Sequence, residues 1–184
     1  MAVREDTVDA LAADIGSLVH ALLEMAAGEP DDWSPAAIPA REPGFARWLA
    51  GRGWGAADAN AGAQKAARIL STTLASADGQ WVLRSREDAG AELAIARVAE
   101  GGAGAGATVE TRVVDRSFVD DGVRWIIDYK TADLGPEADA AHLAAHAERY
   151  RSQLETYAAL FAGEGRPLRL AVFFAAHGVL SALE

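Results

Sequence analysis

An Asp-Gly pair between two strand-like runs constrains the fold of this chain more than any other feature. Val109–Val119 and Val123–Lys130 are rich in apolar residues, and Asp120, Asp121 and Gly122 separate them. Asp-Gly in this setting is the strongest short-range signal of a two-residue hairpin. With Asp121 and Gly122 as the turn, Asp120 pairs with Val123 and, five pairs further along, Asp115 lies opposite Asp128. A three-residue loop would shift the pairing by one and remove that juxtaposition.

Two opposed aspartates need a physical explanation. Directly paired residues have Cβ atoms about 4.5–5.5 Å apart, and like charges at that separation are destabilising. The pair can share a proton, or a divalent cation can lie between the carboxylates. Lys130 lies on the same strand face as Asp128 and favours the ionised cluster. Because Arg116 follows Asp115, a plain surface salt-bridge cluster is an alternative.

The remaining patterns predict an α/β fold. Mixed strand and helix signals favour a central sheet made of an antiparallel meander, a crossover helix and a further strand, flanked by helices. A length of 184 residues with 51% hydrophobic residues fits one domain, residues 1–184. The expected elements are helices over Thr7–Ala27, Phe45–Ala50, Ala56–Ser76 and Glu137–Phe161, a loop over 29–44, an extended segment over 80–87, a strand over Ala91–Val98, a glycine linker over 100–108 and a buried strand over 168–176.

Composition restricts the chemistry and the partners. The absence of cysteine excludes disulfides, cysteine-ligated zinc and iron–sulfur clusters, so a metal must be held by oxygen and histidine. A net charge of -10 opposes loose binding to nucleic acid, so a DNA substrate requires a local basic groove or a partner domain. An acidic start and the lack of a long apolar run predict a cytoplasmic protein without a membrane partner. The final Leu183-Glu184 matches a purification-tag scar, which predicts a fragment of a longer chain.

The acidic pair and its lysine suit metal-assisted phosphodiester hydrolysis. Mg²⁺ prefers oxygen ligands and usually keeps water and substrate phosphate in its shell. Lys130 can orient the attacking water or offset charge on the phosphate, and Glu92 is a candidate third carboxylate. His20 lies about 140° around its helix from Ile15, so it is not a core histidine. A surface histidine is one interpretation of His20; the other is a metal ligand, since its small neighbours would let a sheet rim approach.

Four motifs, taken in order, resemble those of a known nuclease family. They are GSLVHALLE, AELAI, VVDRSFVDDGVRWIIDYKT and QLETY, and the resemblance runs from Gly16 to about Ala175. They are similar to the RecB/AddA-type nuclease domain of the PD-(D/E)XK superfamily, found at the C-terminal end of helicase-nuclease subunits such as those of exodeoxyribonuclease V. The family often has a glycine where this chain has Arg112. No GxxxxGK[ST] phosphate loop occurs, so any ATPase lies outside this chain.

The resemblance implies a restriction-endonuclease-like core and a role for each matching residue. His20, Asp115 and Asp128 would hold the metal with help from the carbonyl of Tyr129, and Lys130 would be the catalytic lysine. Glu92 matches the acidic residue that precedes the metal-binding hairpin. Gln153 and Tyr157 match a Gln-x-x-x-Tyr motif that shapes the site and contacts substrate or catalytic groups, and their i, i+4 spacing puts them on one helix face.

The expected function is therefore a DNA exonuclease or endonuclease that uses Mg²⁺, with Mn²⁺ as a substitute. The resemblance implies DNA as substrate, a helicase domain or subunit as partner, and a role in double-strand-break repair and recombination. One alternative is a non-catalytic module that keeps the nuclease fold to bind DNA or brace a helicase. A carboxylate-pair hydrolase acting on sugars is less favoured, because Lys130 and His20 have no evident task in it.

Overall fold

The chain forms two compact units in the computed structural model. The described residues are 2–86, 88–99 and 108–183, without the side chains of 2–7, 92–99 and 108–112. The helical unit comprises Met1–Ser85, Tyr129–Ala138 and Phe173–Leu180. The hairpin unit comprises Arg86–Asp128, Asp139–Val172 and Ser181–Glu184. The expectation of a single domain stays a prediction.

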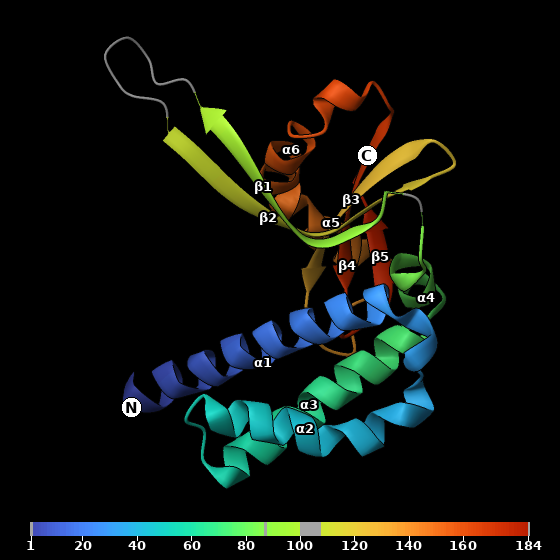
Figure 1. Cartoon of the computed structure of the whole chain (residues 1–184). Helices are drawn as coiled ribbons and strands as arrows, with labels where there is room; N and C mark the ends of the chain where they lie inside the picture. The colour runs from blue at the N-terminus through green and yellow to red at the C-terminus, as the bar shows by residue number, and fades with distance from the viewer. Residues whose placement is uncertain (1, 87, 100–107, 184) are drawn as a thin grey trace. The chain divides into compact units, whose positions relative to one another are not determined.

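Four α-helices make up most of the helical unit. They are α1 (Ala2–Gly28), α2 (Ile38–Gly51), α3 (Ala56–Ala75) and α4 (Ala77–Leu83), with short 3₁₀ turns at Pro30–Asp32 and Pro35–Ala37. Helices α1 and α2 both pack on α3 (Figure 1). The α2–α3 approach is close, since a Cβ at Gly62 would lie 2.7 Å from Leu49 Cδ1. The predicted stripe on α1 is buried at Ile15, Leu18, Val19 and Leu22.

The expected lack of a long apolar run is wrong: a stretch of α1, Val8–Gly28, is long and apolar enough to cross a membrane by length and composition alone. Core helices of soluble proteins pass the same test, and 39% of this stretch's most apolar window is buried inside the structure. The buried stripe described above accounts for part of this hydropathy, while Val8 and Met25 are exposed. The absence of a membrane partner stays a prediction.

Three predicted boundaries in the helices are wrong. Helix α2 begins at Ile38, within the predicted loop, because Pro39 occupies its first turn, where a missing N–H costs nothing, and Pro43 is accommodated inside. Residues 80–83 of the predicted extended segment are helical instead: α4 covers Ala77–Leu83, with Ser76 as the N-cap that accepts from the Gly79 N–H at 2.9 Å. The predicted glycine linker lies outside the described residues except for Thr108.

The predicted single helix over Glu137–Phe161 is the third error. It divides into α5 (Ala140–Ala147), a 3₁₀ turn (Glu148–Tyr150) and α6 (Arg151–Ala158), followed by a short 3₁₀ turn at Ala162–Glu164. Asp139 caps α5 by accepting from the His142 N–H at 2.8 Å, which sets the start of the helix. Neither glycine nor proline marks the break before α6, so the helical periodicity alone could not reveal it.

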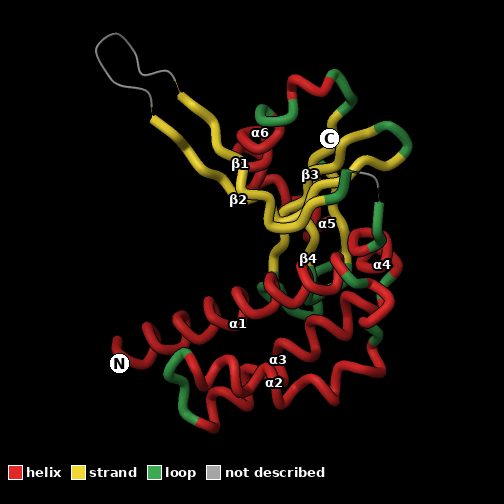
Figure 2. The backbone as a smooth tube through the Cα atoms, in the orientation of Figure 1, coloured by secondary structure: helices red, strands yellow, loops and turns green. Residues whose placement is uncertain are grey.

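The strands form one mixed sheet in the order β1-β2-β3-β4-β5. Their bounds are Gly90–Ala99, Thr108–Asp120, Val123–Lys130, Leu168–Phe174 and Val179–Ala182. Strands β1, β2 and β3 are the antiparallel meander, and β1 and β2 run side by side as long strands (Figure 2). The N–H of Arg124 donates to the Pro167 carbonyl and that of Ala175 to the Lys130 carbonyl, both at 2.9 Å. These bonds advance in the same direction along β3 and β4, so the two strands are parallel.

The sheet confirms the predicted α/β class, and only β5 was not foreseen. That strand has four residues and follows β4 after a short turn. The N–H of Leu183 donates to the Leu170 carbonyl at 2.8 Å, and the Leu183 side chain is buried. A strand of this length carries too few residues to show a recognisable periodicity.

The hairpin turn at Asp121–Gly122 confirms the predicted register. Asp121 has φ 49° and Gly122 has φ 77°, the two left-handed conformations that a two-residue type I′ turn requires. Asp120 pairs with Val123, and the ladder continues without a slip to Arg116 and Ile127. The alternative three-residue loop is excluded.

Asp14 fastens α1 to the segment that follows α2. Its Oδ1 accepts from Arg52 Nε at 2.7 Å and its Oδ2 from Trp54 Nε1 at 2.8 Å. The Trp54 indole N–H, with the Arg52 guanidinium, holds the pKa of the Asp14 carboxyl below its ordinary value of 3.8, although partial burial opposes this. The charged carboxylate is therefore the form that the fold stabilises.

Replacing Gly122 tests the turn. In Gly122→Ala the added methyl group has open space around it. The loss of stability therefore comes only from holding an alanine in the left-handed backbone conformation. We expect the free energy of unfolding, measured by urea titration, to fall by about 1–2 kcal/mol. Gly51→Ala is the matched control, because Gly51 lies in α2 with open space and no positive φ. Equal losses in both variants would contradict the turn assignment.

The Asp14 contacts predict a pH dependence. A lowered pKa in the folded state means that the stabilisation is complete above pH 3.8 and is lost as the pH falls through the folded-state pKa. Asp14→Asn should lower the melting temperature at neutral pH and should flatten its decline in acid, where parent and variant converge. Asp9→Asn, an exposed position on the same helix, is the control and should follow the parent. A parallel acid decline for parent and Asp14→Asn would exclude the contact as its source.

Candidate functional site

Three acidic positions lie in a row across three strands of the hairpin unit. The pairs Ala91–Arg116 and Leu93–Val114 flank Glu92, so the backbone of Glu92 lies opposite Asp115. One step beyond the pair Arg116–Ile127, the same register places Asp115 opposite Asp128. Asp128 is buried, with 4% of its surface exposed, and Asp115 is half-buried. The side chain of Glu92 lies outside the described residues.

Gln153 on α6 holds the carboxylate of Asp128. Its Nε2 donates to Asp128 Oδ1 at 2.8 Å and to the Tyr157 hydroxyl at 2.9 Å. Gln153 and Tyr157 thus share one helix face, as their spacing predicted. Leu154, which follows Gln153 in the sequence, is fully buried. Its burial fixes the rotation of α6 about the helix axis. A donor on a carboxylate oxygen favours the ionised form and limits the rotation of the group.

A buried arginine that the sequence did not single out secures the segment after α6. Arg124 is 4% exposed, and its guanidinium donates to both carboxylate oxygens of Glu164, at 2.9 and 3.0 Å. The same group donates to the Asp88 carbonyl at 3.0 Å and lies 5.1 Å from the centre of the Phe161 ring. Arg124 shares its face of β3 with Asp128. It therefore ties the end of the α6 segment to the strand face that carries the acidic row.

The helical unit brings His20 to Tyr129. The two rings are 5.9 Å apart in an edge-to-face arrangement, and His20 is half-buried. A Cβ at Gly16 would lie 3.2 Å from Thr131 Oγ1, so the small residue allows α1 to approach the end of β3. This approach was predicted from the small neighbours of His20. Tyr129 itself is 2% exposed and packs edge-to-face on Phe173 at 6.0 Å.

The predicted site residues therefore fall into two groups. Asp115, Asp128, Gln153 and Tyr157 belong to the hairpin unit, and His20, Tyr129 and Lys130 to the helical unit. Among the described residues no group of three or more histidine, aspartate and glutamate side chains could hold a metal ion. Mg²⁺ is commonly bound through one or two carboxylates with water and phosphate completing its shell, so the opposed aspartates fit that ion. The full ligand set stays a prediction.

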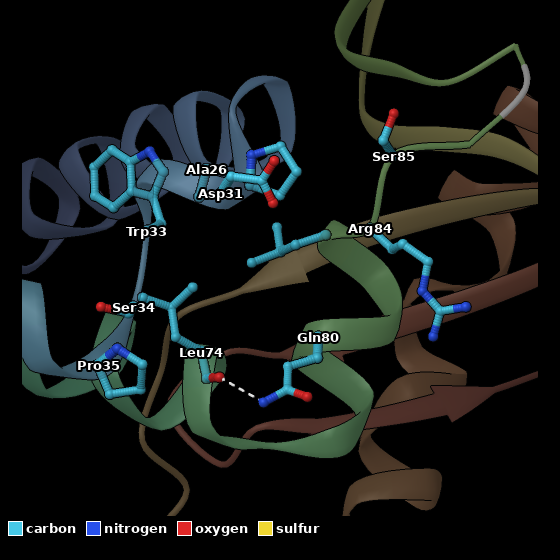
Figure 3. Close-up of a pocket in the computed structure, with 11 residues that line it drawn as sticks. Ala26, Asp31, Trp33, Ser34, Pro35, Leu74, Gln80, Arg84 and Ser85 are labelled. Atoms are coloured by element: carbon cyan, nitrogen blue, oxygen red, sulfur yellow. Dashed lines mark hydrogen bonds between the residues drawn. The ribbon is translucent and has the colours of Figure 1, made fainter.

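A hollow of about 540 Å³ in the helical unit does not involve the predicted site residues. Trp33, Leu74 and Leu83 contribute to its wall, and the Arg84 side chain points away from it (Figure 3). Gln80 Nε2 donates to the Leu74 carbonyl at 3.0 Å along its edge. The volume of this pocket therefore does not locate the predicted site.

Comparison with known protein families assigns the chain to a superfamily. The family model of the PD-(D/E)XK nuclease superfamily matches residues 2–179. The chain belongs to this superfamily. The mixed sheet with flanking helices agrees with the restriction-endonuclease-like fold of PD-(D/E)XK proteins, which are generally metal-dependent nucleases. Among curated proteins, no significant match was found.

The superfamily assignment gives the acidic row a chemical context. PD-(D/E)XK nucleases typically use divalent metals, and a nuclease fold implies a DNA substrate. The segment Asp128-Tyr129-Lys130 has the D-x-K spacing of the pattern from which the superfamily takes its name, and its assignment to that pattern stays a prediction. The half-buried Asp115 is the predicted preceding acidic residue.

The contact between Gln153 and Asp128 predicts a measurable stabilisation. Gln153→Ala removes a donor from a buried carboxylate, and we expect the free energy of unfolding to fall by about 1–3 kcal/mol. Gln64→Ala on α3 is the matched control, because its amide makes no such contact with a carboxylate of the residues that the structure describes. Urea titration of both variants at neutral pH measures the difference. An equal effect of the two substitutions would mean that the hydrogen bond to Asp128 adds nothing.

Proposed function

We propose that this protein is a Mg²⁺-dependent deoxyribonuclease of the RecB/AddA type that hydrolyses phosphodiester bonds. Mn²⁺ should substitute for Mg²⁺. The observation that carries the proposal is the β2–β3 register, which sets Asp115 opposite Asp128 while Gln153 holds the latter. Superfamily membership and the order of the four sequence motifs support it.

The mechanism assigns one task to each residue. Asp115 and Asp128 would bind the ion, with His20 and the Tyr129 carbonyl completing the protein's share of its shell and Glu92 adding a third acidic group. The bound ion would lower the pKa of its water ligand and offset negative charge on the phosphate. Lys130 shares its strand face with Asp128, so its ammonium group can orient the attacking water or stabilise the phosphate oxygens. Gln153 would hold Asp128 in the orientation that binding requires, and Tyr157 would hold Gln153.

The partners follow from charge and resemblance. A net charge of -10 gives the chain little general attraction for DNA, so a helicase domain or subunit would present the strand to the site. We propose a cytoplasmic role in double-strand-break repair and recombination on the same grounds. The resemblance to helicase-associated nuclease domains supports this partner.

Cleavage assays test the proposal. The parent protein with Mg²⁺ should cut single-stranded or double-stranded DNA, and Asp115→Asn, Asp128→Asn and Lys130→Ala should each lose activity on the order of 10²-fold or more. Two controls carry the same chemical changes at unrelated positions: Asp9→Asn and Lys65→Ala should cut at the parent rate. Cleavage that survives in Asp128→Asn and Lys130→Ala would exclude the mechanism.

Calorimetric titration with Mg²⁺ and Mn²⁺ separates an enzyme from a binding module. The nuclease proposal expects binding that is weakened by Asp115→Asn, Asp128→Asn and His20→Ala and is unchanged by Asp9→Asn. A non-catalytic module that braces a helicase would show no binding that depends on the aspartates. Loss in the aspartate variants without loss in His20→Ala would remove His20 from the ligand set.

A further inference from the structure

The segment that follows Lys130 is irregular, and two hydrogen bonds hold its ends. Residues 131–135 belong to no helix or strand. At the first end the Lys130 carbonyl accepts from the Ala175 N–H at 2.9 Å. At the other end the Leu134 N–H donates to His177 Nε2 at 3.0 Å. Both partners come from the turn between β4 and β5, and all of these residues belong to the helical unit.

The same turn is held on another side by the junction of α3 and α4. Thr73, which is fully buried, donates through Oγ1 to the Ala175 carbonyl at 3.1 Å. Beyond the turn, the Leu180 N–H donates to Asp78 Oδ2 at 2.9 Å. Gly178 has φ +64°, and a Cβ there would lie 2.7 Å from the Ser76 Cβ. The turn therefore has little room to move against the α3–α4 junction.

Ala175 connects the contacts of the segment after Lys130 with the contacts at the α3–α4 junction. Its N–H donates to the Lys130 carbonyl, and its own carbonyl accepts from Thr73 and, at 3.3 Å, from the Gly178 N–H. His177 gives a second link, because its Nε2 can accept from Leu134 only while that nitrogen is unprotonated. Asp133 Oδ1 lies 3.7 Å from the same nitrogen and accepts from the Gly135 N–H at 2.8 Å.

We propose that the β4–β5 turn is a clamp that positions Lys130, with Thr73 and His177 as its two positioning residues. Thr73 fixes Ala175, which fixes the carbonyl of Lys130, and His177 fixes the backbone four residues further on. This inference rests on the catalytic role proposed above for Lys130. A lysine that must meet a water or a phosphate oxygen gains from such support, because a displacement of about 1 Å can cost on the order of 10²-fold in rate.

The lysine content of the chain makes a direct test practical. Lys65 and Lys130 are the only two lysines in the sequence. In protein labelled with ¹³C and ¹⁵N at lysine, the side-chain signals of Lys130 can be assigned from Lys130→Ala, and Lys65 on α3 is an internal reference. Thr73→Val and His177→Ala should shift or broaden the Lys130 signals and leave those of Lys65 in place. Thr73→Ser and His177→Gln, which keep a donor and an acceptor respectively, should restore them.

Backbone amide exchange and cleavage kinetics complete the test. Exchange at Leu134 should accelerate in His177→Ala. In DNA cleavage, Thr73→Val and His177→Ala should lower kcat about 10-fold or more with KM unchanged, and the two conservative variants should recover most of the rate. Thr72→Val, at the neighbouring exposed threonine, is the matched control and should behave as the parent.

The outcomes separate this inference from the proposed function. If the parent does not cut DNA, the proposed function fails, and the Lys130 signals still decide whether the clamp positions that side chain. If Leu134 exchange accelerates while the Lys130 signals stay unchanged in both Thr73→Val and His177→Ala, the turn has only a structural role and the inference is overturned. The same conclusion follows if kcat falls equally in Thr72→Val.

Discussion

The register between β2 and β3 is the constraint on which the rest of the acidic arrangement depends. Side chains alternate along a strand, so a slip of one residue would move every side chain of β3 to the opposite face. The left-handed pair Asp121–Gly122 prevents that slip by closing the hairpin with two residues. Asp115 and Asp128 are opposed for this reason, and Glu92 joins their row through the β1–β2 ladder. Two like charges held this way are unfavourable unless a proton or a cation lies between them.

Strand β3 serves both units of the chain, and each unit supports a different residue of the Asp128-Tyr129-Lys130 segment. Gln153 donates to Asp128 in the hairpin unit, and His20 packs on Tyr129 in the helical unit. Lys130 is fixed through its carbonyl by Ala175. Buried polar groups are costly unless they are hydrogen-bonded, so the bond from Gln153 also helps to explain how the buried carboxylate of Asp128 is tolerated. Structural support and the proposed chemistry use the same bonds.

The sequence predicted features that depend on interactions between residues close in the chain, and it missed features that depend on residues far apart. The β2–β3 hairpin, α1 and α3 were predictable because turn chemistry and helical periodicity are local. The break between α5 and α6 lacks a glycine or proline, and α4 required a recognised cap at Ser76. Arg124 could not be linked to Glu164 from sequence, since 40 residues separate them and a guanidinium in a strand is usually exposed. Thr73 and Ala175 are 102 residues apart, and neither has a motif of its own.

The sequence by itself determined the hairpin and its register, and with them the opposition of Asp115 and Asp128, because the Asp-Gly turn and period-two alternation act over a few residues. The i, i+4 spacing of Gln153 and Tyr157 was readable for the same reason. Only the tertiary structure decided that Gln153 donates to Asp128, that Gly16 lets α1 approach Thr131, and that the β4–β5 turn holds both ends of the Lys130–Leu134 segment. Those contacts join residues that are distant in the chain, and their partners are selected by packing geometry, which no local pattern encodes.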